Sequence, residues 1–91
     1  MDTVQPCAGI EPAVVDGVVR SVGDTILSAD DKAGVAAILE GVRRVVEAGS
    51  EHPDVTVLLT TCEEVHLLGS GALAEGELPE GAPCYVLDAA G

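Results

Sequence analysis

The pattern that most constrains this sequence is an amphipathic helix followed within a few residues by an apolar strand. Between residues 31 and 48, apolar residues recur every three or four positions, a spacing that places them on one face of a helix. Gly49 predicts where that helix ends. The run VTVLLTT at 55–61 is β-branched and apolar, as in a strand that is buried on both faces. The six residues of the predicted helical stripe are Val35, Ile38, Leu39, Val42, Val45 and Val46.

Shorter patterns predict the remaining elements. Two apolar runs within Ile10–Val19 flank Asp16 and Gly17, a strong signal for a two-residue hairpin. Residues 67–74 form a weak helical pattern, and CYVL at 84–87 reads as a second buried strand. A strand, a helix and a further strand in this order predict a parallel sheet with right-handed crossovers. We therefore expect an α/β fold, with a parallel or mixed sheet flanked by helices.

Charge limits the classes of partner. The chain of 91 residues carries a net charge of -12 with only four Lys and Arg. Nucleic acid is therefore excluded as a partner, because phosphate binding needs clustered basic residues. An anionic membrane surface is disfavoured for the same reason.

The cysteines and the first residues bear on localisation. Cys7, Cys62 and Cys84 are odd in number and do not form a C-x-x-C pair, so we expect reduced thiols. The start MDTVQPC has neither the basic region nor the apolar stretch of a signal peptide, and no apolar run is as long as a membrane span. These features predict a cytoplasmic protein.

Carboxylates recur at one predicted place, the edge of the sheet where its strands end. Asp30 opens the helix, Glu63 and Glu64 follow the run at 55–61, and Asp88 follows the run at 84–87. Ligands of open α/β sheets bind at that edge. Four carboxylates in one place repel one another, and two divalent cations would cancel their charge. Each residue also has a simpler interpretation, as a helix N-terminal charge, a solvated loop or a turn, and spacing alone leaves both interpretations open.

Three segments resemble one family in the right order. They are GDTILSADDKAGVAAILE (residues 23–40), TTCEEVHLLGS (60–70) and CYVLDAAG (84–91). Together they resemble the peptidase T-like tripeptide aminopeptidases, within the broader co-catalytic zinc exopeptidases. The resemblance implies a zinc-exopeptidase catalytic domain, two divalent metal ions (zinc most often, with Mn, Co or Mg as alternatives), and hydrolysis of the N-terminal peptide bond of a short peptide substrate.

The resemblance also implies a role for each acidic residue. Asp30 matches the carboxylate that bridges both metals, Glu64 a ligand of one metal and Asp88 a ligand of the other. Glu63 matches the general base. Asp2 matches the carboxylate that orients a metal-binding histidine, and the peptide bond after Asp30 is expected to be cis.

The sequence departs from the family pattern at several places. It opens at Met1 inside the family's H-x-D motif, so we expect residues 1–91 to be a partial catalytic domain without the upstream histidine, the lid or dimerisation domain and the distal histidine. What remains is an all-oxygen site, which suits Mg, Mn or Ca better than zinc. His66 stands where the family has Gly, as a substitute ligand or a tolerated loop residue. We expect the isolated chain to be inactive and poorly soluble.

Alternatives to catalysis remain open at this point. The chain could be a non-catalytic truncated reading frame, or an acidic cation-binding or interaction fragment. A homodimer, or a partner chain that supplies the missing half, would each complete the fold.

Overall fold

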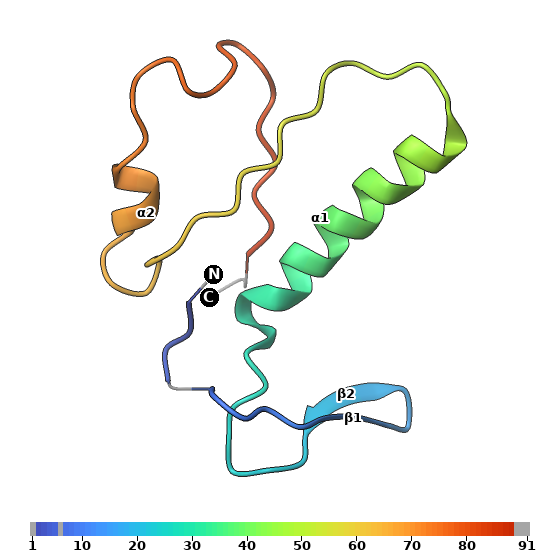
Figure 1. Ribbon diagram of the computed structural model, residues 1–91, viewed down its shortest axis with the longest axis vertical. Helices are drawn as coiled ribbons and strands as arrows, with labels where there is room; N and C mark the ends of the chain where they lie inside the picture. The colour runs from blue at the N-terminus through green and yellow to red at the C-terminus, as the bar shows by residue number, and fades with distance from the viewer. Residues whose placement is uncertain (1, 6, 89–91) are drawn as a thin grey trace.

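The computed structural model describes residues 2–5 and 7–88, which form a hairpin, one long helix and one short helix joined by extended segments (Figure 1). The order of elements is β1 (Pro12–Val15), β2 (Val18–Ser21), α1 (Ala29–Ala48) and α2 (Leu68–Gly71). No helix in the described part of the chain has both the length and the hydropathy needed to cross a membrane. The structure is therefore a small mixture of helix and strand.

The predicted hairpin is confirmed. β1 and β2 pair in antiparallel register, with Val15 opposite Val18. Asp16 (φ 51°) and Gly17 (φ 77°) both lie in the left-handed region. A two-residue hairpin loop favours positive φ at both positions because its twist then matches that of the strands, and Asp-Gly tolerates this conformation well.

Helix α1 also agrees with the sequence pattern. Asp30 and Asp31 have non-helical φ and ψ, so the regular helix starts after Asp31, as the sequence predicts. At the other end Gly49 adopts φ 60°, and its N–H donates to the Val46 carbonyl at 3.2 Å. The bond between Asp30 and Asp31 is cis, as the family resemblance implies. The pattern at 67–74 becomes the single turn of α2.

The two predicted buried strands were wrong for the described chain. Neither 55–61 nor 84–87 is a strand, and the described residues form no sheet other than the β1–β2 hairpin. Their side chains are open to solvent, with Val55 57% and Tyr85 83% exposed. The physical reason is that an apolar run becomes a buried strand only when other elements pair with its backbone and cover its faces. The expected parallel sheet is therefore not shown.

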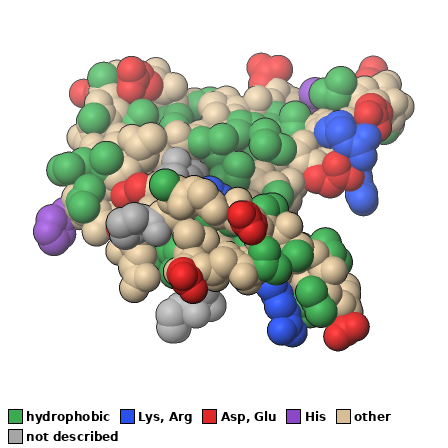
Figure 2. All heavy atoms as spheres, turned by 60° about the horizontal axis from the view of Figure 1, so that its bottom comes forward, with side chains coloured by type: hydrophobic (Ala, Val, Ile, Leu, Met, Phe, Trp, Pro, Cys, Tyr) green, Lys and Arg blue, Asp and Glu red, His purple; other side chains and the backbone are tan. Residues whose placement is uncertain are grey.

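The described part of the chain lacks a hydrophobic core. Among the described residues no hydrophobic side chain is buried, and Ser28 is buried with 5% exposed. The accessible surface is 7275 Å², against about 4,900 Å² for a compact chain of this size. The radius of gyration is 15.9 Å, against about 12 Å for a compact domain of this length. Figure 2 shows hydrophobic side chains lying open across this face of the molecule.

We predict that the isolated chain loses its helical circular-dichroism signal gradually on heating and binds a hydrophobic dye before heating. Cooperative unfolding requires the simultaneous loss of a packed core, and the described residues bury no apolar side chain. Circular dichroism, dye fluorescence and sedimentation check this. A sharp two-state transition in a monomer would contradict it.

Candidate metal-binding site

Four stretches that are far apart in the sequence converge near the first turn of α1 (Figure 1). They are the residues around Asp2, the start of α1, the residues around Glu63, and the end of the described chain at Asp88. Asp30 and Asp31 lie at the start of that helix, and Asp88 lies at the end of the described chain. Each offers one carboxylate oxygen, and these oxygens lie within 4.8 Å of one another. The three aspartates line a hollow of about 670 Å³ together with apolar residues that include Val86 and Leu87. Two of the predicted ligands, Asp30 and Asp88, are therefore brought to ligand distance.

Asp31 belongs to this cluster and was missed as a site residue. The N–H of Gly34 donates to its Oδ1 at 3.1 Å, which is the bond that an N-cap residue accepts three positions along a helix. A Cβ at position 34 would collide with the Asp31 carboxylate, so any other residue there would force that side chain to shift. The signal was present in the sequence as the spacing D-x-x-G at the helix start. Asp31 thus caps α1 and fixes the direction in which the helix leaves the site.

Glu64 lies in the field of the other acidic residues but outside the 4.8 Å group. Desolvation raises the pKa of its carboxyl, and the negative charges of Glu63, Asp30, Asp2 and Asp88 raise it further. The side chain is exposed, so solvent screens part of this repulsion. All five residues singled out by the sequence therefore share one electrostatic neighbourhood.

The raised pKa of Glu64 determines how this residue makes the stability of the fold depend on pH. Because its pKa is raised in the folded chain, the folded state holds this proton over a pH range in which the unfolded state has lost it. The contribution of protonated Glu64 to the stability of the folded state is therefore present at low pH. It is lost as the pH rises through the pKa that Glu64 has in the folded state. The negative charges around Glu64 oppose its ionisation, and a bound cation would relieve that repulsion.

Asp2 holds the segment that carries the two glutamates. The Glu63 N–H donates to Asp2 Oδ1 at 2.8 Å, a contact that joins the first residues to the middle of the chain. Desolvation acts to raise the pKa of Asp2, but hydrogen bonds from the backbone N–H groups of Glu63 and Glu64 outweigh it and lower the pKa. This carboxylate stays ionised at neutral pH and fixes the backbone at Glu63.

A tight turn completes the support of Glu63. The N–H of Gly69 donates to the Thr61 carbonyl at 3.0 Å, and the N–H of Leu67 donates to the Glu63 carbonyl at 3.1 Å. A Cβ at position 69 would collide with the backbone of Thr61, so this approach also needs glycine. The turn therefore places the start of α2 in contact with Thr61 and Cys62, the two residues before Glu63.

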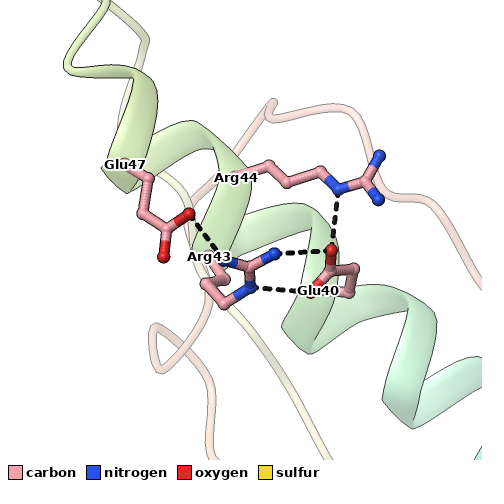
Figure 3. Close-up of polar contacts among 4 residues, drawn as sticks. All are labelled: Glu40, Arg43, Arg44 and Glu47. Carbon is pink, nitrogen blue, oxygen red and sulfur yellow. Dashed lines mark hydrogen bonds and ion pairs between the residues drawn. The ribbon is translucent and has the colours of Figure 1, made fainter.

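The two arginines of α1 are engaged elsewhere. Arg43 bonds both oxygens of Glu40 at 2.7 and 2.8 Å and reaches Glu47 at 2.5 Å, while Arg44 reaches Glu40 at 2.7 Å (Figure 3). These bonds lower the pKa of Glu40, first through Arg43 and then through Arg44. The network is solvent-exposed and contributes little stability. It begins ten residues after Asp30, about 15 Å along the helix, so its cations do not neutralise the acidic cluster.

The histidines do not join the cluster. His66 is exposed with φ 70°, and it is not among the described side chains that lie within ligand distance of one another. The ring of His52, beyond the far end of α1, lies 2.8 Å from the Pro53 carbonyl through Nδ1. His66 therefore takes no part in the cluster in this structure.

The donor set tests which cation would fit. The described cluster offers carboxylate oxygens, which suit hard cations such as Mg²⁺, Mn²⁺ and Ca²⁺, whereas zinc sites in proteins are rich in nitrogen and sulfur donors. The hollow beside the three aspartates provides room for a bound ion and its water molecules. The residues present therefore fit a divalent cation with a preference for oxygen.

Comparison with known proteins places the chain in a family. Residues 1–90 match peptidase family M20/M25/M40. The chain belongs to this family. Peptidases of the M20 family generally use divalent metal ions, which agrees with the acidic cluster. The predicted resemblance is therefore confirmed as membership of the M20 family. The roles predicted for Asp2, Asp30, Glu63, Glu64 and Asp88 stay predictions.

Two curated relatives share parts of the chain. The uncharacterised protein YqjE of Bacillus subtilis (strain 168) is 45% identical over 73 residues, which are 80% of this chain and 20% of YqjE. Peptidase T of Serratia proteamaculans (strain 568) is 42% identical over 55 residues, 60% of this chain and 13% of that protein. No solved structure matches the chain. This M20 chain thus spans a fifth or less of the length of either relative.

We predict that Asp30→Asn and Asp88→Asn each weaken Mn²⁺ binding about tenfold or more, because each removes one charged ligand from a site whose affinity depends on ligand charge. Calorimetric titration of Mn²⁺ measures the affinity. The matched control is Glu51→Gln, which makes the same change of charge beyond the far end of α1. Equal weakening in the control would show diffuse charge attraction rather than a site.

We predict that Mn²⁺ affinity rises with pH through the raised pKa of Glu64 and then levels off, because bound protons compete with the cation. In Glu64→Gln the affinity at neutral pH should fall and its dependence on pH in this range should flatten. Titrations at a series of pH values check both. An unchanged slope in the variant would contradict a contribution from Glu64.

Proposed function

We propose that this chain carries the acidic metal centre of an M20 aminopeptidase that hydrolyses the N-terminal peptide bond of short peptides. The observation that carries the proposal is the approach of Asp30 and Asp88 to within 4.8 Å from two distant segments. Membership of the M20 family supports it. Because the chain spans only part of its relatives' length, the activity is proposed for an M20 unit that contains these residues.

The proposed ligands divide between two cations. Asp30, at the first turn of α1, would contact both, with Glu64 on one and Asp88 on the other. When bound, the pair of cations would polarise the peptide carbonyl and make a water molecule more acidic. The raised pKa of Glu64 supports this arrangement, since the charges of Asp30 and Asp88 add to desolvation in raising it.

Glu63 is the proposed general base. Its carboxylate would accept a proton from the attacking water and then deliver that proton to the leaving amine. The hydrogen bond from its backbone N–H to Asp2 supports the assignment, because it fixes the residue beside the acidic cluster. Asp2 would therefore act through Glu63 as a positioning residue.

Zinc is the metal that the family resemblance implies, with an imidazole on each ion. The described cluster by itself offers oxygen, so we propose that residues 1–91 alone bind Mn²⁺ or Mg²⁺ in preference to zinc. The same observation favours a second candidate function, a cation-binding segment without catalysis. We expect no peptide hydrolysis from the isolated chain.

A chimera separates the two functions. In Serratia peptidase T, the segment that corresponds to this chain is replaced by the chain, and hydrolysis of a tripeptide is measured with and without chelator. We predict chelator-sensitive hydrolysis, and in the Glu63→Gln variant of the chimera a fall in kcat of about 10²- to 10⁴-fold with little change in KM.

The control for the chimera is Glu51→Gln, which should leave kcat unchanged. A folded, metal-loaded chimera in which Glu63→Gln has the activity of its parent would reject Glu63 as the base. If the folded, metal-loaded chimera is inactive, the non-catalytic cation-binding function is supported instead.

A further inference from the structure

The backbone just before the acidic cluster adopts a conformation that its residue type disfavours. Ser28, two positions before Asp30, has φ 63° and ψ 38°, which lie in the left-handed region. This region is unfavourable for L-residues because Cβ comes too close to the following carbonyl oxygen, whereas glycine adopts it freely. A serine stays in such a conformation only where its surroundings hold it there.

The side chain that contacts Ser28 is Lys32. Lys32 Nζ donates to Ser28 Oγ at 2.5 Å, four residues along the chain. Ser28 makes no side-chain hydrogen bond that caps α1, which is the usual role of a serine at a helix start, and Asp31 supplies the cap instead. Ser28 is also the most deeply buried of the described residues, with 5% of its surface exposed. The contact with Lys32 is therefore shielded from solvent on the serine side.

The backbone at Ser28 determines where the Asp30 carboxylate lies. Only Ala29 separates the two residues, and Ala29 and Asp30 line the acidic hollow together with Asp88. One oxygen of Asp30 lies within 4.8 Å of one oxygen of Asp88. A change of φ and ψ at Ser28 would turn the backbone that follows it and carry the Asp30 carboxylate away from Asp88.

A different role for Lys32, as a counter-charge for the carboxylates, fits the structure less well. Its ammonium group binds a neutral hydroxyl, and Lys32 is not among the residues that line the acidic hollow. A positive charge two residues from Asp30 would also repel a bound cation. Removal of the charge alone would therefore strengthen cation binding, whereas removal of a group that holds Ser28 would weaken it.

We propose that Lys32 is a positioning residue of the metal centre and acts through Ser28. Its hydrogen bond holds Ser28 in the left-handed conformation and so keeps the Asp30 carboxylate beside Asp88. The inference rests on the metal centre proposed above and does not depend on peptide hydrolysis. A glycine at position 28 would make the lysine unnecessary, because glycine adopts this conformation without support.

The test is a mutant cycle in the 91-residue chain, measured by calorimetric titration of Mn²⁺. Lys32→Met removes the charge and the donors, and should weaken Mn²⁺ binding about tenfold or more, as loss of a group that orients a ligand commonly does. Lys32→Arg should recover most of the affinity, because its guanidinium can still donate to the hydroxyl. In a Ser28→Gly chain, Lys32→Met should not weaken binding. The matched control is Arg44→Met, which removes a positive charge bound to Glu40 and should leave the affinity unchanged.

The conformation of Ser28 gives a second readout that needs no metal. The one-bond coupling between Cα and Hα distinguishes positive from negative φ in NMR spectra. It should report positive φ at Ser28 in the parent and in Lys32→Arg, and lose that signature in Lys32→Met. A parent chain that binds no Mn²⁺ would reject the proposed metal centre, and the coupling would still decide whether Lys32 holds Ser28.

Three results would overturn the proposal. One is Mn²⁺ binding in Lys32→Met that is as tight as in the parent or tighter, which would leave Lys32 only the effect of its charge. Another is equal weakening by Lys32→Met in the Ser28→Gly chain, which would mean that Lys32 acts on the fold or the site without Ser28. The third is an unchanged Ser28 coupling in Lys32→Met.

Discussion

Repulsion between carboxylates is the constraint on which the rest of this structure depends. Asp30, Asp31 and Asp88 bring oxygens within 4.8 Å of one another. Desolvation raises the pKa of Glu64, and the charges of the neighbouring acids raise it further. Such an arrangement is costly at neutral pH unless a cation offsets it. Two hydrogen bonds hold the acidic residues in place. The Asp31 carboxylate accepts one from the Gly34 N–H at the start of α1, and the Asp2 carboxylate accepts the other from the Glu63 N–H. Backbone hydrogen bonds therefore support the geometry of the acidic cluster.

Local features of the fold could be predicted from the sequence because local chemistry determines them. The Asp16–Gly17 loop defines the hairpin through its two positive φ values, and Gly49 ends α1 through a single backbone hydrogen bond. The runs at 55–61 and 84–87 did not form strands because their pattern is that of buried strands, and the described residues supply no elements that bury them. Their composition is that of segments that need burial, whereas in the structure their side chains are exposed to solvent.

The candidate site was predicted better than the sheet that suggested it. Asp30 and Asp88 were expected to meet because strand ends share one edge, and they do meet, although no parallel sheet joins them. Asp31 was missed as a member of the cluster because its role is local, as a cap on Gly34. His66, which the sequence left open as a ligand, lies outside the described cluster. Peptidases of the M20 family generally use divalent metal ions, which agrees with a metal site at these positions.

Leu87 and residues of α1 line both the acidic hollow and a separate, almost wholly apolar groove. The central claim is that residues from four stretches, around Asp2, Asp30, Glu64 and Asp88, surround the position proposed for a pair of cations. Paramagnetic broadening of amide NMR signals by substoichiometric Mn²⁺ tests it most directly. The account predicts joint broadening at Asp2, Asp30, Glu64 and Asp88, while Glu51 and Glu80 stay sharp. Broadening confined to Asp30 and Asp31, or spread evenly over all acidic residues, would contradict it.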